Sequence, residues 1–342
     1  MAYTTINKPT DYFNTKLYTG NGSTQSITGV GFQPDWTWVK SRSGAYNHEV
    51  MDVIRGDGVG LFPNLNNAES SGRSLSAFTS DGFTLNGSDT TSNNNGSTYA
   101  SWNWLAANAS SSNTDGDITS TVSANTTSGF SIVQWTGNGT AGSTVGHGLG
   151  SEMKFMILKD YSLSRSWITY HHSLGGGSGI NFNENGAAGT SSSYWNDTDA
   201  TSSVFSTGVY SNENNSNYIC YCFSEVKGFS KFGSYTGNGN ADGNFVYLGF
   251  KPALVLVKNS SLSGENWVLL DNKRNIDNPT NLALFPNLSN AESGTYPFDF
   301  VSNGFKIRDA SASYNRSGDV FIFMAFAEAP LVGSNNVPAT AR

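Results

Sequence analysis

Short apolar segments alternate with runs of glycine, serine, threonine and asparagine along the whole chain. In some of these segments every second residue is apolar, as in Trp36, Thr37 and Trp38, which is typical of a strand with one buried face. Others, such as residues 254–257, are apolar throughout, which indicates burial on both faces. No segment sustains the periodicity of a helix. The pattern predicts an all-β chain of β-sandwich type, either jelly-roll or lectin-like.

The same pattern occurs three times. A Thr-Gly-Asn-Gly turn after an aromatic residue appears at residues 18–22, 135–139 and 235–239. Each turn is followed by an apolar segment closed by Lys40, Lys159 or Lys258, and each unit ends in an aromatic segment at residues 99–104, 218–223 or 321–326. Residues 61–70 and 284–293 differ only at Asn66 and Ser289. We therefore expect three tandem β-sandwich units, with the first and third the closest relatives.

The repeat defines the predicted boundaries. We expect an N-terminal arm at residues 1–11, units at 12–107, 128–226 and 227–330, and a C-terminal tail at 331–342. Residues 108–127 are rich in Ser, Thr and Asn and are predicted to be a linker. The second unit has drifted from the other two and has a glycine-rich loop at residues 174–189, so it is expected to carry any specialised surface.

Composition narrows the classes of function. Charged residues make up 13% of the 342 residues and the formal net charge is −7, which argues against nucleic-acid binding. No apolar run is long enough for membrane insertion, and the first residues do not resemble a secretory signal. Cys220 and Cys222, on one face of a predicted strand, are expected to be two small buried hydrophobic residues in a reducing cytoplasm. No cofactor is expected.

The acidic residues do not assemble into a predicted catalytic site. Paired carboxylates would be needed for glycoside hydrolysis. Four candidates belong to the repeated frame, since Asp52 and Glu69 match Asp271 and Glu292, and the fifth candidate is Glu49. Structural pairing of Asp52 with Arg55 or with Lys40 is the favoured interpretation. We therefore predict that the protein is not an enzyme and has no catalytic residue.

Weaker signals concern ligands. The run Asn113-Thr-Asp115-Gly-Asp117 resembles the start of a calcium loop but lacks the closing glutamate, and the four histidines lack metal-ligand spacing, so no metal site is predicted. Exposed aromatic residues on a sandwich can stack on sugars, although most aromatic side chains must fill cores. The candidate glycan contacts are Tyr18, Trp135, Tyr235, Tyr194 and Trp195.

Several segments also carry a family resemblance. They are residues 1–20, 31–40, 81–83, 99–104, 194–198, 287–292 and 321–327. Together they resemble uncharacterised repeat-containing virion structural proteins of marine bacteriophages, and the resemblance covers nearly the whole chain. It implies a phage structural protein on the virion surface, assembled in the host cytoplasm, but it implies neither a catalytic residue nor a position in the virion.

Two functions are therefore expected. The first is a non-enzymatic subunit on the particle surface, in capsid decoration or a short head or tail fibre, with other virion proteins as partners. It would form a homo-oligomer such as a trimer, or imitate a local threefold with its three units. The alternative is a lectin-like receptor-binding protein that recognises a host surface glycan.

Overall fold

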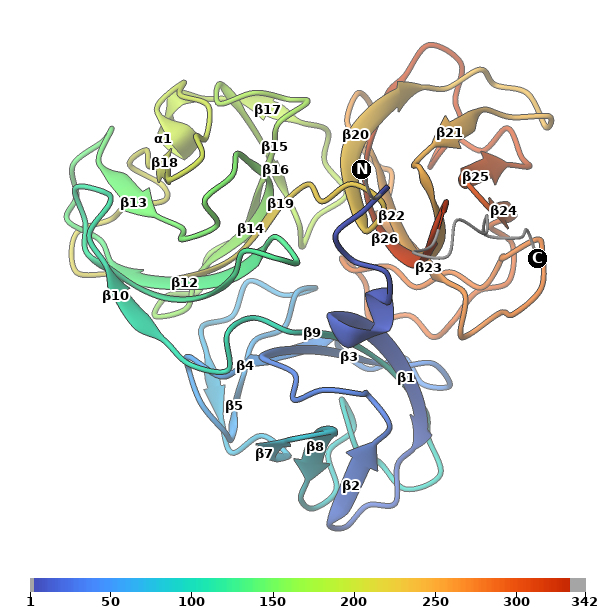
Figure 1. The fold of residues 1–342 in the computed structure, drawn as a ribbon, viewed down its shortest axis with the longest axis horizontal. Coiled ribbons are helices and arrows are strands. Elements are labelled where there is room, and N and C mark those ends of the chain that lie inside the picture. Colours follow the sequence, from blue (N-terminus) through green and yellow to red (C-terminus); the bar gives the residue numbers. More distant parts are fainter. Residues whose placement is uncertain (1–2, 333–342) are drawn as a thin grey trace.

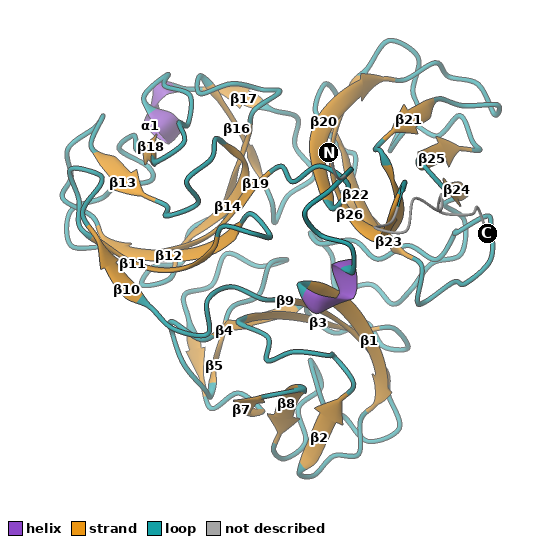
Figure 2. Ribbon diagram, in the orientation of Figure 1, coloured by secondary structure: helices purple, strands orange, loops and turns teal. Residues whose placement is uncertain are grey.

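Three lobes surround a common centre in the computed structural model of the chain, which describes residues 3–332 (Figure 1). Nearly all regular elements are antiparallel strands, which confirms the predicted all-β class (Figure 2). Within these residues the helical elements are the 3-10 turn Pro9–Asp11 (η1) and the short helix Ser192–Trp195 (α1). We call the lobes 1, 2 and 3 in chain order.

Lobe 1 contains strands β1 to β9. They are β1 (Phe13–Thr19), β2 (Gln25–Thr28), β3 (Trp36–Ser41), β4 (Glu49–Asp52), β5 (Val59–Gly60), β6 (Ser70–Ser71), β7 (Leu75–Thr79), β8 (Gly82–Leu85) and β9 (Thr98–Trp104). The larger sheet has the order β1-β9-β3-β4 and faces the centre of the molecule (Figure 1). The smaller outer sheet has the order β2-β8-β7, and β5 pairs with β6.

Lobe 2 contains strands β10 to β19. They are β10 (Ser111–Asn113), β11 (Ser120–Asn125), β12 (Phe130–Thr136), β13 (Thr144–Gly146), β14 (Met153–Asp160), β15 (Ile168–His171), β16 (Ser178–Asn181), β17 (Gly189–Thr190), β18 (Val204–Ser206) and β19 (Asn217–Ser224). The inner sheet has the order β10-β11-β12-β19-β14-β15-β16-β17, and β13 pairs with β18 on the outside.

Lobe 3 contains strands β20 to β26. They are β20 (Ser230–Thr236), β21 (Phe245–Tyr247), β22 (Phe250–Asn259), β23 (Val268–Asp271), β24 (Phe298–Val301), β25 (Gly304–Ile307) and β26 (Val320–Pro330). Its inner sheet, β20-β26-β22-β23, repeats the order of lobe 1, and its outer sheet is β21-β25-β24. In every lobe the closing strand, β9, β19 or β26, lies between the strand that precedes the Thr-Gly-Asn-Gly turn (β1, β12 or β20) and the strand that contains the repeated lysine (β3, β14 or β22).

The inner sheets are buried on both faces. Along β19, Ile219, Tyr221 and Phe223 join a core shared by all three lobes. Tyr218, Cys220 and Cys222 alternate with them and join the separate core of lobe 2. Because successive strand residues point to opposite faces, burial of both faces favours a segment that is apolar throughout, as in residues 218–223 of β19. In β9 the buried polar residues Ser101 and Asn103 are bonded to each other instead. Both cysteines are buried on one face of β19, as expected.

The shared core is held by aromatic contacts between lobes. Trp36 of lobe 1 stacks on Tyr221 of lobe 2 with ring centroids 4.3 Å apart. Phe13 of lobe 1 stacks on Phe326 of lobe 3 at 5.0 Å, and Phe232 of lobe 3 lies 5.9 Å from Phe223 of lobe 2. Each lobe thus contributes large side chains to both of its neighbours, and no lobe buries its inner face alone.

The Thr-Gly-Asn-Gly motif is a turn clamped by a buried asparagine. In lobe 3 the amide of Asn315 donates to Asn238 Oδ1, Asn240 O and Asp309 O, and its Oδ1 accepts from Asn238 N. Asn93 and Asn212 accept from the equivalent backbone N–H in the other lobes. The first glycine is required by close approach, since a Cβ at Gly237 would lie 2.2 Å from a backbone oxygen.

The predicted linker is the main error in the domain boundaries. Residues 108–127 carry β10 and β11, and β11 pairs with β12 as part of the inner sheet of lobe 2. Ala107 N donates to Ser123 Oγ, and Val122 is buried. Strands at the edge of a sheet have one solvent-facing side, so a Ser/Thr-rich segment with few apolar residues can form them.

The structure describes most of the predicted N-terminal arm but only the first two residues of the predicted C-terminal tail. In the arm at residues 1–11, Ile6 and Pro9 are buried and Tyr3 Oη donates to Gly249 O of lobe 3 at 2.7 Å. The arm therefore packs against the ring of lobes. Of the predicted tail at 331–342, residues 333–342 lie outside the described residues.

Loss of an asparagine clamp should destabilise the chain. We expect Asn315→Ala to lower the free energy of unfolding by about 3 kcal/mol, because it leaves several buried polar groups without partners. Chemical denaturation with tryptophan fluorescence would measure this. The matched control is the exposed Asn240→Ala, expected within about 0.5 kcal/mol of wild type. Equal effects of the two substitutions would contradict the clamp.

Candidate functional site

Buried polar side chains form hydrogen bonds across the junctions between lobes. Asp52, His171 and Asp271 occupy equivalent ends of β4, β15 and β23, where they pair with β3, β14 and β22. Each reaches the closing strand of the next lobe. The contacts are Tyr221 Oη to Asp52 Oδ2 at 2.9 Å, Trp102 Nε1 to Asp271 Oδ2 at 3.0 Å, and His171 Nε2 to Phe323 O at 3.2 Å. They run from lobe 1 to 2, 2 to 3 and 3 to 1, which closes a ring.

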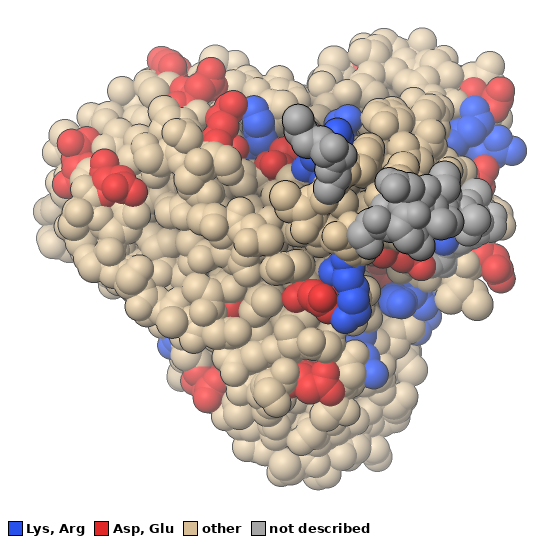
Figure 3. Space-filling view, in the orientation of Figure 1, with Lys and Arg blue, Asp and Glu red and all other residues tan. Residues whose placement is uncertain are grey.

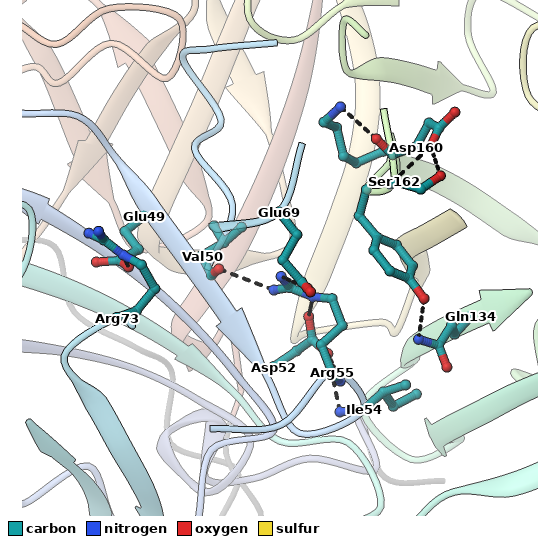
Figure 4. Close-up of polar contacts among 12 residues, drawn as sticks. Glu49, Val50, Asp52, Ile54, Arg55, Glu69, Arg73, Gln134, Asp160 and Ser162 are labelled. Carbon is teal, nitrogen blue, oxygen red and sulfur yellow. Dashed lines mark hydrogen bonds and ion pairs between the residues drawn. The ribbon is translucent and has the colours of Figure 1, made fainter. Parts of the chain in front are cut away.

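Arg55 organises the junction of lobes 1 and 2 (Figure 4). Its Nε donates to Asp52 Oδ2 at 2.6 Å, its Nη1 to Glu69 Oε2 at 3.0 Å, and its Nη2 to Val50 O at 3.2 Å. The Arg55 side chain is 1% exposed, and the neighbouring carboxylate of Asp52 holds its pKa above the usual value despite burial. Asp52 is thus ion-paired with Arg55, as the spacing predicted.

Arg274 repeats this arrangement between lobes 3 and 1. It bonds Asp271 at 2.6 Å and Glu292 at 3.0 Å, and Glu292 also accepts two bonds from Arg42 of lobe 1. Glu49, the remaining acidic candidate, is paired with Arg73 at 2.5 Å inside lobe 1. All five acidic candidates therefore pair with arginine, and the side chains of three of them, Asp52, Asp271 and Glu292, also bond a neighbouring lobe.

The junction of lobes 2 and 3 uses histidine in place of an ion pair. The rings of His171 and His172 stack at 5.2 Å, and His172 Nε2 lies 3.1 Å from Phe232 O of lobe 3. Strand β15 ends at His171, so His172 does not continue the alternation of the strand and its ring can lie against that of His171. The equivalent of Tyr221 and Trp102 in lobe 3 is Met324, which has no polar hydrogen, so the histidine bonds a backbone carbonyl.

In lobe 2 the segment equivalent to residues 63–69 keeps the same backbone contacts, although its sequence has diverged. Trp167 N donates to Asn183 Oδ1 at 2.9 Å, as His48 N does to Asn64 in lobe 1. Residues 182–188 therefore correspond to residues 63–69, and Ala188 stands where lobe 1 has Glu69. Each lobe also bonds its neighbour through the backbone. These bonds are Glu69 N to Tyr161 O, Ala188 N to Ser260 O and Glu292 N to Arg42 O, each 2.9 Å.

The three repeated lysines are buried and bonded to carbonyl oxygens. Lys159 Nζ donates to Asp160 O, Leu163 O and Arg165 O of its own lobe and to Asn66 O of lobe 1. Lys258 likewise reaches Asn185 O of lobe 2. Burial lowers the pKa of Lys40 to about 7 and those of Lys159 and Lys258 to about 8. Lys40 donates to Ser41 O and Gly44 O, so the alternative pairing of Lys40 with Asp52 is not the one formed.

The predicted glycan contacts mostly serve the fold. Tyr18, Trp135 and Tyr235 stack on closing-strand rings, and the partners and centroid distances are Tyr99 at 5.2 Å, Tyr218 at 5.1 Å and Phe321 at 5.1 Å. Trp135 and Trp195 are buried, so neither ring is accessible for stacking on a sugar. Tyr194 is half-buried against Tyr210. Tyr18, Trp135 and Tyr235 occupy equivalent positions in the three lobes, and their repetition reflects this packing.

The acidic residues of the segment that resembles a calcium loop form local hydrogen bonds. Asp117 accepts from Thr144 N and Oγ1, and Asp115 is bonded to Asn113. Within residues 3–332 no three His, Cys, Asp or Glu side chains gather as a metal site. In that same part of the chain, the helices are all too short or too polar to cross a membrane.

These features define an all-β protein of three sandwich lobes joined in a closed ring. Residues 8–330 match the domain of unknown function DUF7483, and the chain belongs to that family. Comparisons with curated proteins and with solved structures found no match.

Removing one junction hydroxyl should destabilise the chain without changing its shape. We expect Tyr221→Phe to lower the free energy of unfolding by about 2 kcal/mol, because Asp52 loses a buried donor. Tyr194→Phe, in a half-buried tyrosine away from the junctions, is the control and should change stability by under about 0.5 kcal/mol. Urea unfolding measures both, and a neutral Tyr221→Phe would show that the junction bond contributes nothing.

Acid should also weaken the fold. His48, His147 and His171 are buried with Nδ1 accepting an N–H, which leaves Nε2–H to donate and keeps each ring neutral. Burial lowers their pKa values, for His147 to about 4 and for His171 to about 3. The unfolded chain takes up these protons below about pH 6.5 and the native state does not, so stability falls as pH decreases.

The expected loss between pH 6.5 and 5 is about 2–4 kcal/mol, measured by urea unfolding across that range. Asp35 opposes it, because burial raises the pKa of this carboxyl to about 6 and the native state therefore binds its proton first. Asp35→Asn should accordingly steepen the decline. A stability that stays constant from pH 6.5 to 5 would contradict the neutral histidines.

Proposed function

We propose that this chain is a non-enzymatic structural protein of a bacteriophage particle surface, in capsid decoration or a short head or tail fibre. The observation that carries the proposal is the closed ring of junctions, in which Asp52, His171 and Asp271 each bond the next lobe. Such a ring makes one rigid body from one chain. The arrangement of three similar lobes is compatible with binding at a threefold symmetry axis of the particle or to a trimeric partner.

The use of the acidic residues supports a structural role. General acid–base catalysis by a carboxylate needs a group whose protonation state can change during the reaction. Asp52 and Asp271 instead each accept from an arginine at 2.6 Å and from a ring donor of a neighbouring lobe. Their side chains are 0% exposed. Both residues hold lobes together, which is a reason for their repetition.

The surface fits an assembled particle. Figure 3 shows a face on which most atoms belong to residues other than Lys, Arg, Asp and Glu. The polarity comes from Ser, Thr, Asn and 38 Gly residues. Neutral polar side chains keep such a surface soluble without a strong dependence on salt. The expected partners are other virion proteins and further copies of this chain.

A lectin-like, receptor-binding role is the second candidate. One observation favours it, namely the aromatic residues Phe245 and Tyr247, which are exposed on the outer sheet of lobe 3. Aromatic faces on β-sandwiches can stack on sugar rings, so a host surface glycan is the expected partner in that case.

Labelling of purified particles tests the proposal. We expect mass spectrometry to find the chain in particles, and gold-conjugated antibody against it to decorate the capsid or the tail in electron micrographs. Label at the distal tail alone would exclude the capsid version and favour the receptor-binding candidate. Absence of the chain from intact particles, with the chain present in the lysate, would refute both virion roles.

A further inference from the structure

The outer strands β2, β13 and β21 are equivalent, and they differ in what they present to solvent. Their middle residues Ile27, Val145 and Val246 are buried and pair with Phe83, Phe205 and Phe305. The flanking residues point outward. They are Ser26 and Thr28 in lobe 1, Thr144 and Gly146 in lobe 2, and Phe245 and Tyr247 in lobe 3.

Only in lobe 3 is this face both open and aromatic. In lobe 2 the segment around Asn113 covers it, since a Cβ at Gly146 would lie 1.7 Å from Asn113 Oδ1. In lobe 1 the exposed side chains are small and polar, and Ser26 contacts Thr84. Phe245 and Tyr247 are 47% and 49% exposed. The fold does not require aromatic rings here, because lobe 1 forms the same sheet with Ser and Thr.

Cations accompany the aromatic pair. Lys306 pairs with Phe245 in the strand register, Arg308 follows on the same side, and Lys231 Nζ lies 5.3 Å from the Tyr247 ring centroid. The corresponding residues of lobe 1 are Asn14 for Lys231, Thr84 for Lys306 and Asn86 for Arg308. Figure 3 shows Lys and Arg gathered at the outer edge of lobe 3.

The charge of this face contrasts with the rest of the molecule. Lys306 and Arg308 are partly exposed and share Asp242 at 2.8 and 3.6 Å, and Arg308 also pairs with Asp299 at 3.3 Å. With Lys231 the face has three cations and two anions, on a chain of formal net charge −7. Such a local excess of positive charge complements an anionic ligand.

The aromatic and cationic chemistry continues beside the strand. Tyr3 Oη donates to Gly249 O next to Tyr247, and Lys227 Nζ lies 4.7 Å from the Tyr3 ring centroid. Tyr3 and Lys227 line a surface hollow of about 730 Å³ together with Thr4, Val226 and Glu225, whose carboxylate offsets the charge of Lys227. A second ring–cation pair thus extends the surface past the end of β21, which suits a chain-like ligand more than a single small molecule.

We propose that this outer face of lobe 3, formed by Phe245, Tyr247, Lys231, Lys306 and Arg308, binds an acidic polysaccharide. Alternate residues of a strand point the same way, roughly 7 Å apart, so the two rings can stack on successive sugars. The cations pair with carboxylate or sulfate groups along the ligand. The inference deepens the receptor-binding candidate and rests on it only for the biological source of the ligand.

Affinity electrophoresis of the purified chain tests the site, with alginate, dextran sulfate or neutral dextran cast in the gel. We expect retardation by at least one acidic polymer and none by dextran. Phe245→Ser with Tyr247→Thr, which installs the lobe 1 residues, should weaken the affinity at least tenfold. Lys306→Thr with Arg308→Asn should weaken it and reduce its dependence on salt.

Controls separate binding from folding and from the virion role. Val209→Ser, an exposed apolar residue of lobe 2, should leave retardation unchanged, and thermal unfolding should confirm that every variant folds. Retardation by neither acidic polymer, or equal retardation of wild type and the Phe245/Tyr247 double variant, would overturn the site. Either result leaves the particle-labelling outcome free to support the structural role.

Discussion

Packing of three inner sheets against one another is the constraint on which the rest of the structure depends. Each inner sheet is covered by its own outer sheet on one side and by the two other lobes on the opposite side. The stack of Trp36 on Tyr221 and that of Phe13 on Phe326 place large aromatic surfaces where no single lobe could bury them. Most polar groups that enter these junctions are therefore hydrogen-bonded, because water does not reach them, although the indole nitrogens of Trp36 and Trp104 have no partner. The arginine clusters, carbonyl-bound lysines and neutral histidines all follow from that exclusion of water.

The junctions follow one geometry but use different chemistry. Arg55 and Arg274 hold carboxylates at two of them, while at the third His171 bonds the backbone carbonyl of Phe323. Buried ion pairs contribute little net stability compared with apolar packing, since desolvation offsets their attraction. They penalise wrong pairings strongly, because an arginine set against the wrong lobe would lie buried without its carboxylate. Different junctions thus distinguish otherwise similar lobes during folding, when tandem units can pair incorrectly.

Much of this architecture could be predicted from sequence, and the failures have physical causes. The strand pattern, the repeated turn and the pairing of Asp52 with Arg55 depend on residues close in the chain. The segment 108–127 was misassigned because β10 is an edge strand with mostly exposed side chains and β11 buries the small polar residues Ser120 and Ser123, so both have the composition of a linker. Three of the glycan candidates, Tyr18, Trp135 and Tyr235, were repeated aromatic residues, and their repetition reflects a packing contact such as that of Tyr18 on Tyr99. Phe245 and Tyr247 were missed because an aromatic strand looks like core until it is aligned with Ser26 and Thr28.

The three lobes belong to one polypeptide, and this has a consequence for how a surface can diversify. In a true homotrimer any substitution appears three times, so a recognition face is always trivalent. Here lobe 3 exposes Phe245 and Tyr247 where lobe 1 has Ser26 and Thr28, so each chain is monovalent for whatever that face contacts. Avidity must then come from the number and spacing of chains displayed together, and it can be set independently of the internal threefold geometry.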